Sequence, residues 1–129
     1  MSIPFWCLFA VALLIYIAKI PVAKAMKEEG RGYDNHHPRA QQARLTGFGA
    51  RALAAHQNTI EAFPLFAAGV LVAHVTQTQG WFVEALALLF VVTRVLYLFL
   101  YWNDKATLRS LAWGVGLLCC LLLMLSPAL

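Results

Sequence analysis

Several polar side chains that could bind a charged ligand stand inside long apolar stretches of this sequence. Asn58 and Glu61 lie three residues apart in one stretch, and Arg94, Tyr97 and Tyr101 follow in the next. An ionised side chain in the apolar interior of a membrane costs roughly 2.5 to 3.5 kcal/mol on insertion scales unless a partner compensates it. We therefore expect Glu61 to pair with Arg94, and we expect these side chains to form one shared binding site.

Helical periodicity groups these residues further. At about 100 degrees per residue, Arg51, Asn58 and Glu61 fall on one side of a helix, while His56 points well away from that side. The polar residues of the next stretch, spaced i, i+3 and i+7, also share one face. Two readings stay open: a buried ion pair that fixes helix register, or two polar stripes that together bind a ligand.

A further cation, Arg109, opens the last apolar stretch, with Lys105 one turn before it. A positive charge at the start of a helix interacts unfavourably with the helix dipole, so we expect another interaction to favour arginine at this position. Arg109 either anchors the helix at the membrane surface or faces an anionic group bound between helices. The histidines and cysteines match no metal-ligand spacing, so we expect no metal site.

The elements that must position these residues follow from composition. The chain has 129 residues, of which 61% are hydrophobic and 12% charged, with a mean hydropathy of +0.69. Its apolar stretches approach the roughly 20 residues that cross a bilayer as a helix, and they lack the alternation of barrel strands. We expect one all-α integral membrane domain over residues 1–129, a bundle of four transmembrane helices at about 3–24, 48–75, 81–102 and 107–126.

Charge distribution predicts the orientation of the bundle. Most Lys and Arg residues flank or occupy the long connection at about residues 25–47, and none lies in the connection between the second and third helices. The positive-inside rule then places the long connection in the cytoplasm and both termini outside. The net charge of +4 fits this topology and contact with membrane lipid. Without interleaved stacking aromatics, we expect no nucleic-acid partner.

Four local features refine this outline. The first apolar run lacks a basic stretch before Ile3 and is long for a signal peptide, so we expect it to remain as a helix that ends near Pro21. The long connection is rich in polar residues and glycine and should be irregular, either as a cover over a site or as a linker. Pro64 predicts a kink just after Glu61. Ala112 and Gly116 form a small-xxx-small pair that favours close helix packing.

Taken together, the motifs resemble the MAPEG family, the membrane-associated proteins in eicosanoid and glutathione metabolism. The resemblance rests on the pattern Arg-x4-His-x-Asn-x2-Glu-x2-Pro from Arg51 to Pro64, on Arg94-x2-Tyr97-x3-Tyr101, and on Arg109-Ser110. It covers the four-helix layout and most of the chain after Lys24. Some members of the family carry an arginine where Ala54 stands and a tyrosine where Trp113 stands.

This resemblance implies a homotrimer in a bacterial-type inner membrane that binds glutathione as a cosubstrate between neighbouring subunits. It implies a transferase or peroxidase acting on lipophilic electrophiles, with Arg109 stabilising the glutathione thiolate. The implied glutathione contacts are Arg51, His56, Asn58, Glu61, Arg94, Tyr97, Tyr101 and Ser110.

Two alternatives stay open. The first is a noncatalytic lipid-binding or scaffolding protein of the same fold, because a fold does not determine an activity. The second is a small multidrug transporter, which would also combine four short helices with a glutamate inside the membrane. Its essential acid would lie in the first helix, where this chain has none.

Overall fold

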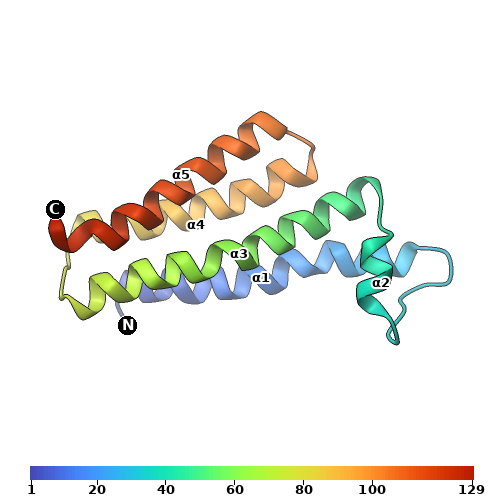
Figure 1. Ribbon diagram of the computed structural model, residues 1–129, viewed down its shortest axis with the longest axis horizontal. Helices are drawn as coiled ribbons and strands as arrows, with labels where there is room; N and C mark the ends of the chain where they lie inside the picture. Colours follow the sequence, from blue (N-terminus) through green and yellow to red (C-terminus); the bar gives the residue numbers. More distant parts are fainter.

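Four long helices and one short helix make up the computed structural model, which describes residues 1–129 (Figure 1). The elements in chain order are α1 (Ile3–Glu28), α2 (Pro38–Ala43), α3 (Gly47–Val75), α4 (Trp81–Trp102), α5 (Ala106–Leu125) and a 3-10 turn (Ser126–Ala128). The four long helices are each long and apolar enough to cross a membrane. The protein is therefore an integral, multi-pass membrane protein, and the predicted all-α fold with four spans is confirmed.

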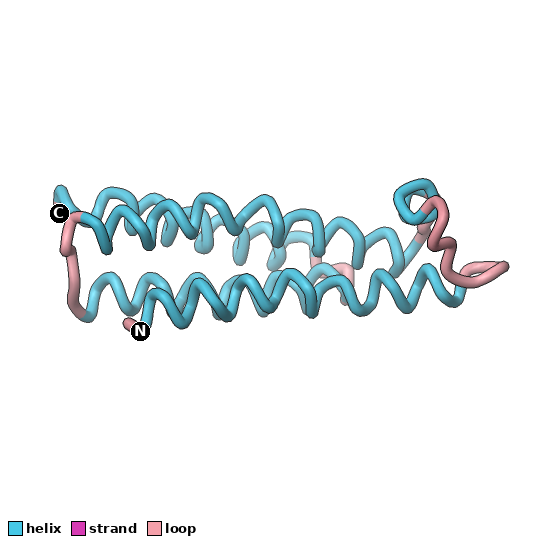
Figure 2. The backbone as a smooth tube through the Cα atoms, turned by 90° about the horizontal axis from the view of Figure 1, so that it is seen from below, coloured by secondary structure: helices cyan, strands magenta, loops and turns pink.

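The long helices run side by side along the length of the molecule (Figure 2). Both termini lie at one end of the bundle, and α2 with its loops lies at the other (Figure 1). The largest helix interfaces join α1 to α3 and α4 to α5, and smaller ones join α5 to α3 and α4 to α1 and α3. This arrangement brings the polar stripes of α3 and α4 next to the beginning of α5.

Two glycines let α5 approach its neighbours closely. A Cβ atom at Gly69 of α3 would lie 2.9 Å from the Cβ of Leu123 and 3.1 Å from the carbonyl oxygen of Cys120. A Cβ atom at Gly116 of α5 would lie 3.0 Å from the Thr93 hydroxyl of α4. The close packing that the sequence predicts at Gly116 is therefore present, with α4 as the partner.

Two prolines fall inside helices without ending them. The sequence predicts that the first span ends near Pro21, but α1 continues through Pro21 to Glu28. Helix α3 likewise continues through Pro64 to Val75. Each proline still removes the backbone donor that the carbonyl one turn earlier would use, which at Pro64 is the carbonyl of Ile60.

The long connection is more ordered than the sequence predicts. It contains α2, and the buried side chain of Gln41 ties this helix to the end of α1. The Gln41 amide nitrogen donates to the carbonyl oxygens of Met26 at 3.0 Å and Gly32 at 2.8 Å, and its oxygen accepts from the Asp34 amide at 2.9 Å. Helix α2 stays separate from α3, which starts at Gly47 with a positive φ of 54°.

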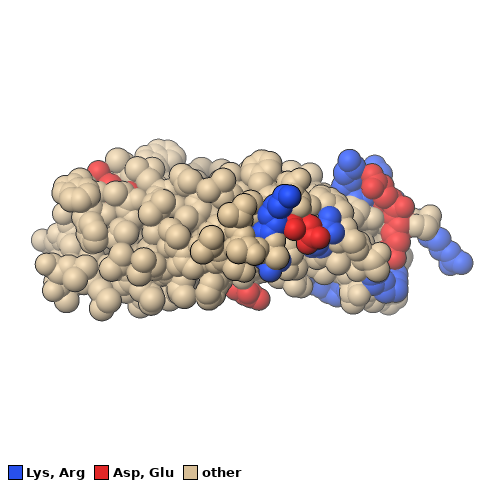
Figure 3. All heavy atoms as spheres, turned by 90° about the horizontal axis from the view of Figure 1, so that it is seen from above, with Lys and Arg blue, Asp and Glu red and all other residues tan.

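The charged residues are distributed unevenly along the bundle. Lys and Arg atoms gather over the end that carries α2, while the opposite half of the visible surface is almost free of them (Figure 3). The basic residues thus mark one end of the bundle, as the predicted topology requires.

Candidate functional site

Asn58 links the charged side chains of α3 and α4. Its Oδ1 accepts a hydrogen bond from Arg94 Nη2 at 3.0 Å, and its Nδ2 donates to Glu61 Oε2 at 3.4 Å. The direct ion pair that we expect between Glu61 and Arg94 is wrong, because no such pair lies within 4.0 Å. Asn58 sits almost one turn before Glu61 on the same side of α3, and its amide has both a donor and an acceptor. Asn58 can therefore bridge the Arg94 guanidinium and the Glu61 carboxylate through its amide.

Arg94 is a buried cation without an acidic partner. Only 2% of the residue is exposed. Besides the bond to Asn58, Nη2 donates to the Thr59 hydroxyl at 3.4 Å, and Nε has no partner. The guanidinium lies 4.3 Å from the centre of the Tyr97 ring, which offers it a cation–π contact. Only neutral groups contact this charge directly, and the Glu61 carboxylate reaches it through Asn58, so the position is costly unless an anion binds nearby.

Arg109 makes a similar contact with the other tyrosine of α4. Its guanidinium carbon lies 4.2 Å from the centre of the Tyr101 ring. The rings of Tyr97 and Tyr101 meet edge to face with their centres 5.6 Å apart. Two arginines and two tyrosines from α4 and α5 consequently form one continuous row.

Two adjoining cavities open along this row. The first has a volume of about 210 Å³ and is lined by Asn58, Tyr97, Tyr101, Arg109, Ser110 and Trp113. The second, of about 220 Å³, is lined by Asn58, Glu61, Ala62, Leu65, Phe90, Arg94, Trp113, Gly116, Leu117 and Cys120. Asn58 and Trp113 belong to both, so they form the boundary between a mainly polar cavity and a mainly apolar one.

All the site residues that the sequence predicts line these cavities, except Arg51 and His56. Arg51 lies nearer the α2 end, where its Nη2 donates to the carbonyl oxygen of Trp102 at 3.4 Å. His56 is buried on the side of α3 that faces α1, with Nδ1 3.0 Å from the carbonyl oxygen of Ile15. It is two residues from Asn58 and so lies about 200 degrees around the helix.

The family model described as the MAPEG family matches residues 3–129, essentially the whole chain. The chain belongs to the MAPEG family. No curated protein and no solved structure matches it. Membership in the MAPEG family makes it a membrane protein of glutathione-related or lipid metabolism.

The predicted site does not include three residues at or beside the cavities of this MAPEG protein. The Thr59 hydroxyl accepts a hydrogen bond from the Arg94 guanidinium, and Phe90 and Cys120 line the apolar cavity. Helical spacing on α5 offered a signal for the last of these, because Arg109, Trp113, Gly116 and Cys120 follow one another at intervals of four, three and four. Nothing in the sequence pattern distinguishes Thr59 from an ordinary threonine in a helix.

Proposed function

We propose that this protein binds glutathione and presents its thiolate to a lipophilic electrophile or peroxide, as a membrane glutathione transferase or peroxidase. The observation that carries the proposal is Arg94, a buried guanidinium with no carboxylate within ion-pair distance, which lines a cavity that adjoins the one lined by Arg109. Glutathione is an anionic peptide and would supply the missing negative charge. Family members are generally associated with glutathione, which supports this choice of anion.

In this proposal Arg109 acts on the thiol. A nearby guanidinium stabilises a thiolate and lowers the pKa of the thiol, which raises the fraction that is nucleophilic at neutral pH. Tyr101 would hold the guanidinium in place through its ring, and Ser110 lines the same cavity. Arg109 is thus the catalytic residue that we propose.

The other predicted residues would bind the peptide. Asn58, Glu61 and Arg94 offer donors and acceptors at the boundary of the cavities, with Tyr97 beside them. Arg51 would reach the peptide from the α2 end. His56 faces α1, so in this proposal it positions α3 and makes no contact with glutathione within its own subunit.

The apolar cavity would receive the electrophile. Leu65, Phe90 and Leu117 supply apolar walls. A thiolate at the boundary formed by Asn58 and Trp113 would attack an electrophilic carbon in this cavity, so that a carbon–sulfur bond forms and the leaving group departs with its electron pair. A thiol nucleophile and a lipophilic acceptor would thereby meet inside the membrane.

Thiolate formation tests the proposal directly. Glutathione added to purified protein should produce the ultraviolet absorbance of a thiolate at neutral pH. Arg109→Ala should abolish this signal, Arg109→Lys should retain part of it, and Arg44→Ala, a change at an exposed position outside both cavities, should leave it intact. No signal from the unmodified protein, or an equal signal from Arg109→Ala, would contradict the proposed mechanism.

The same family resemblance supports a homotrimer. In one subunit Glu61 is exposed and Arg51 is partly exposed, so a neighbouring subunit could complete the site. The mass of the protein in a lipid nanodisc, corrected for lipid, should equal three chains. A mass of one chain that still gives the thiolate signal would show that the trimer is not needed.

A noncatalytic lipid-binding protein is the second candidate. The mainly apolar lining of the apolar cavity and the stacking of Arg109 on Tyr101 favour it, because both fit a site that needs no thiol. This function predicts that glutathione gives no thermal stabilisation and that Arg109→Ala leaves the binding of a hydrophobic fluorescent probe unchanged.

A further inference from the structure

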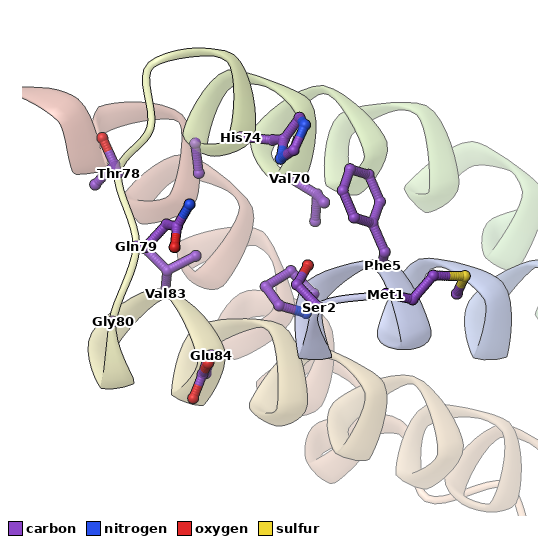
Figure 4. A pocket seen from close by; sticks show the side chains of 12 residues that line it. Met1, Ser2, Phe5, Val70, His74, Thr78, Gln79, Gly80, Val83 and Glu84 are labelled. Carbon is purple, nitrogen blue, oxygen red and sulfur yellow. The ribbon is translucent and has the colours of Figure 1, made fainter.

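A larger cavity lies at the other end of the bundle, where both termini are found (Figure 4). It has a volume of about 410 Å³ and is lined by Met1, Ser2, Pro4, Phe5, Val70, Ala73, His74, Thr78, Gln79, Gly80, Val83 and Glu84. These residues come from the start of α1, the end of α3, the following turn and the start of α4. Along α3 at 1.5 Å per residue, Val70 lies about 18 Å from Asn58, so the cavity is separate from the proposed glutathione site.

The inner part of this cavity is apolar. Val70, Ala73 and Val83 are nearly fully buried and form its floor. Phe5 and His74 meet edge to face with ring centres 4.8 Å apart and form one wall. The volume falls within the range of about 300 to 1,000 Å³ that is typical of small-molecule sites. An apolar chain therefore fits the interior.

The rim carries hydrogen-bonding groups and one formal negative charge among its side chains. Ser2, Thr78 and Gln79 are neutral, and Glu84 lies half-buried in the first turn of α4. No lysine or arginine lines the cavity. The ion pairs of the chain, Lys24–Glu28 and Arg44–Glu29, both lie at the end that carries α2. The α-ammonium group of Met1, which also lines the cavity, forms no ion pair within 4.0 Å, so Glu84 has no cationic partner in the structure.

We propose that this cavity binds an amphiphile that has a primary ammonium head and an apolar chain. The ammonium pairs with the Glu84 carboxylate and donates its remaining protons to oxygen atoms of the rim, and the chain covers Val70 and Val83. The helices begin and end here, so the cavity sits where a lipid headgroup meets its acyl chains. Phosphatidylethanolamine and free long-chain amines share this chemistry.

Thermal unfolding of the delipidated, detergent-solubilised protein tests the site. Phosphatidylethanolamine and dodecylamine should each raise the midpoint temperature, whereas phosphatidylglycerol and dodecanol, which lack the ammonium, should not. A response to dodecylamine alone identifies free amines as the ligand, and a response to phosphatidylethanolamine alone identifies the phospholipid. An equal response to dodecanol or phosphatidylglycerol, or no response to either amine, overturns the proposal.

Two variants assign the response to this cavity. Glu84→Gln should weaken amine binding by about tenfold, a change equivalent to 1.4 kcal/mol. Gln79→Trp should block the rim, while Val75→Trp, a change at a neighbouring position that is 77% exposed and outside the lining, should bind normally. Glu84→Gln should also keep the glutathione thiolate signal, because Glu84 is remote from Arg109. Undiminished amine binding by both Glu84→Gln and Gln79→Trp contradicts the assignment.

Discussion

Asn58 has more influence on the site than its uncharged side chain suggests. It receives a hydrogen bond from Arg94 at 3.0 Å and lines both cavities. Asn58→Ala would remove the best acceptor of a buried guanidinium, and leaving such a donor unsatisfied costs about 1 to 3 kcal/mol. We expect a lower thermal midpoint for the purified variant than for the unmodified protein.

The neighbouring residue provides the control for this prediction. Gln57 is exposed and has no side-chain hydrogen bond, so Gln57→Ala should unfold at the temperature of the unmodified protein. If Asn58→Ala and Gln57→Ala unfold together, the hydrogen bond to Arg94 contributes nothing measurable to stability.

Tyr101 acts through its ring in the proposed site. Tyr101→Phe keeps the face on which Arg109 lies, whereas Tyr101→Leu removes it. A cation–π contact contributes about 0.5 to 2 kcal/mol, so the leucine variant should place Arg109 less well and give a weaker thiolate signal with glutathione. Titration of that ultraviolet signal should show Tyr101→Phe close to the unmodified protein. Equal signals from Phe and Leu would assign the role of Tyr101 to something other than its ring.

The sequence predicted which polar residues share a face but not how they pair. Helical angles placed Asn58 and Glu61 on one side of α3 and Arg94 on a facing stripe. They did not give the relative height of two antiparallel helices, and this height decides which side chain meets Arg94. Thr59 and the contact of His56 with Ile15 depend on the same packing, so they became visible only in three dimensions.

At the level of helices, the contact between α3 and α5 depends on Gly69. In Gly69→Ala the new Cβ would meet Leu123 Cβ at 2.9 Å and a backbone oxygen at 3.1 Å, distances that force the helices apart. Overpacking of this kind typically costs about 1 to 3 kcal/mol. Thermal unfolding of the purified variant should show a clear loss of stability.

Gly114, a glycine of α5 that packs against nothing, serves as the matched comparison for Gly69 of α3. A Cβ at Gly114 would meet nothing within 4 Å, so Gly114→Ala should gain the roughly 0.5 to 1 kcal/mol by which alanine is favoured over glycine in a helix. A stabilising Gly69→Ala would contradict the packing described for α3 and α5.

The loop before α2 should respond to acid. The backbone amides of His37 and His36 both donate to Asp34 Oδ1 at 3.0 Å and hold the pKa of Asp34 below its ordinary value. A lowered pKa in the folded state means that the stabilisation is complete above the unfolded-state value of about 3.9 and is lost as pH falls through the folded value.

Pepsin cleavage of residues 29–37 checks this expectation. Measured against a free peptide of residues 29–37, because pepsin is itself more active at lower pH, cleavage should become faster as pH falls below the unfolded-state value of about 3.9 toward the lowered pKa of Asp34. Asp34→Ala should be cleaved readily already at pH 5, because it lacks the acceptor at every pH. A variant that resists pepsin as well as the unmodified protein does would show that this turn does not order the loop.

The four long helices could be predicted from the sequence, whereas the structure of the connection between α1 and α3 could not. The apolar stretches are long enough that burial in lipid decides the outcome, and even Pro21 and Pro64 do not interrupt the helices. Helix α2 is too short for periodicity to reveal, and it is held by Gln41 through backbone carbonyl groups of Met26 and Gly32. Such contacts leave no mark on a hydropathy pattern.

For the whole molecule, the uneven distribution of basic residues predicts the orientation in the membrane. We expect the end with α2 to face the cytoplasm and both termini to face the opposite side. In intact bacterial cells, a membrane-impermeant maleimide should label Ser2→Cys, and it should label Arg31→Cys only after permeabilisation. The native Cys7, Cys119 and Cys120 are buried, so the background should be low. Labelling of Arg31→Cys alone in intact cells would reverse the orientation.

The glycine contacts of α5 also limit how the apolar cavity can adapt to ligands. Gly116 lines this cavity and touches α4, and Gly69 holds α5 against α3 through main-chain atoms just below it. Outward movement of α5 would separate both contacts at once, so we expect the cavity to keep its width when a ligand binds. A change in substrate size during evolution is therefore expected through the side chains at Trp113 and Leu117, with the helix backbone left in place.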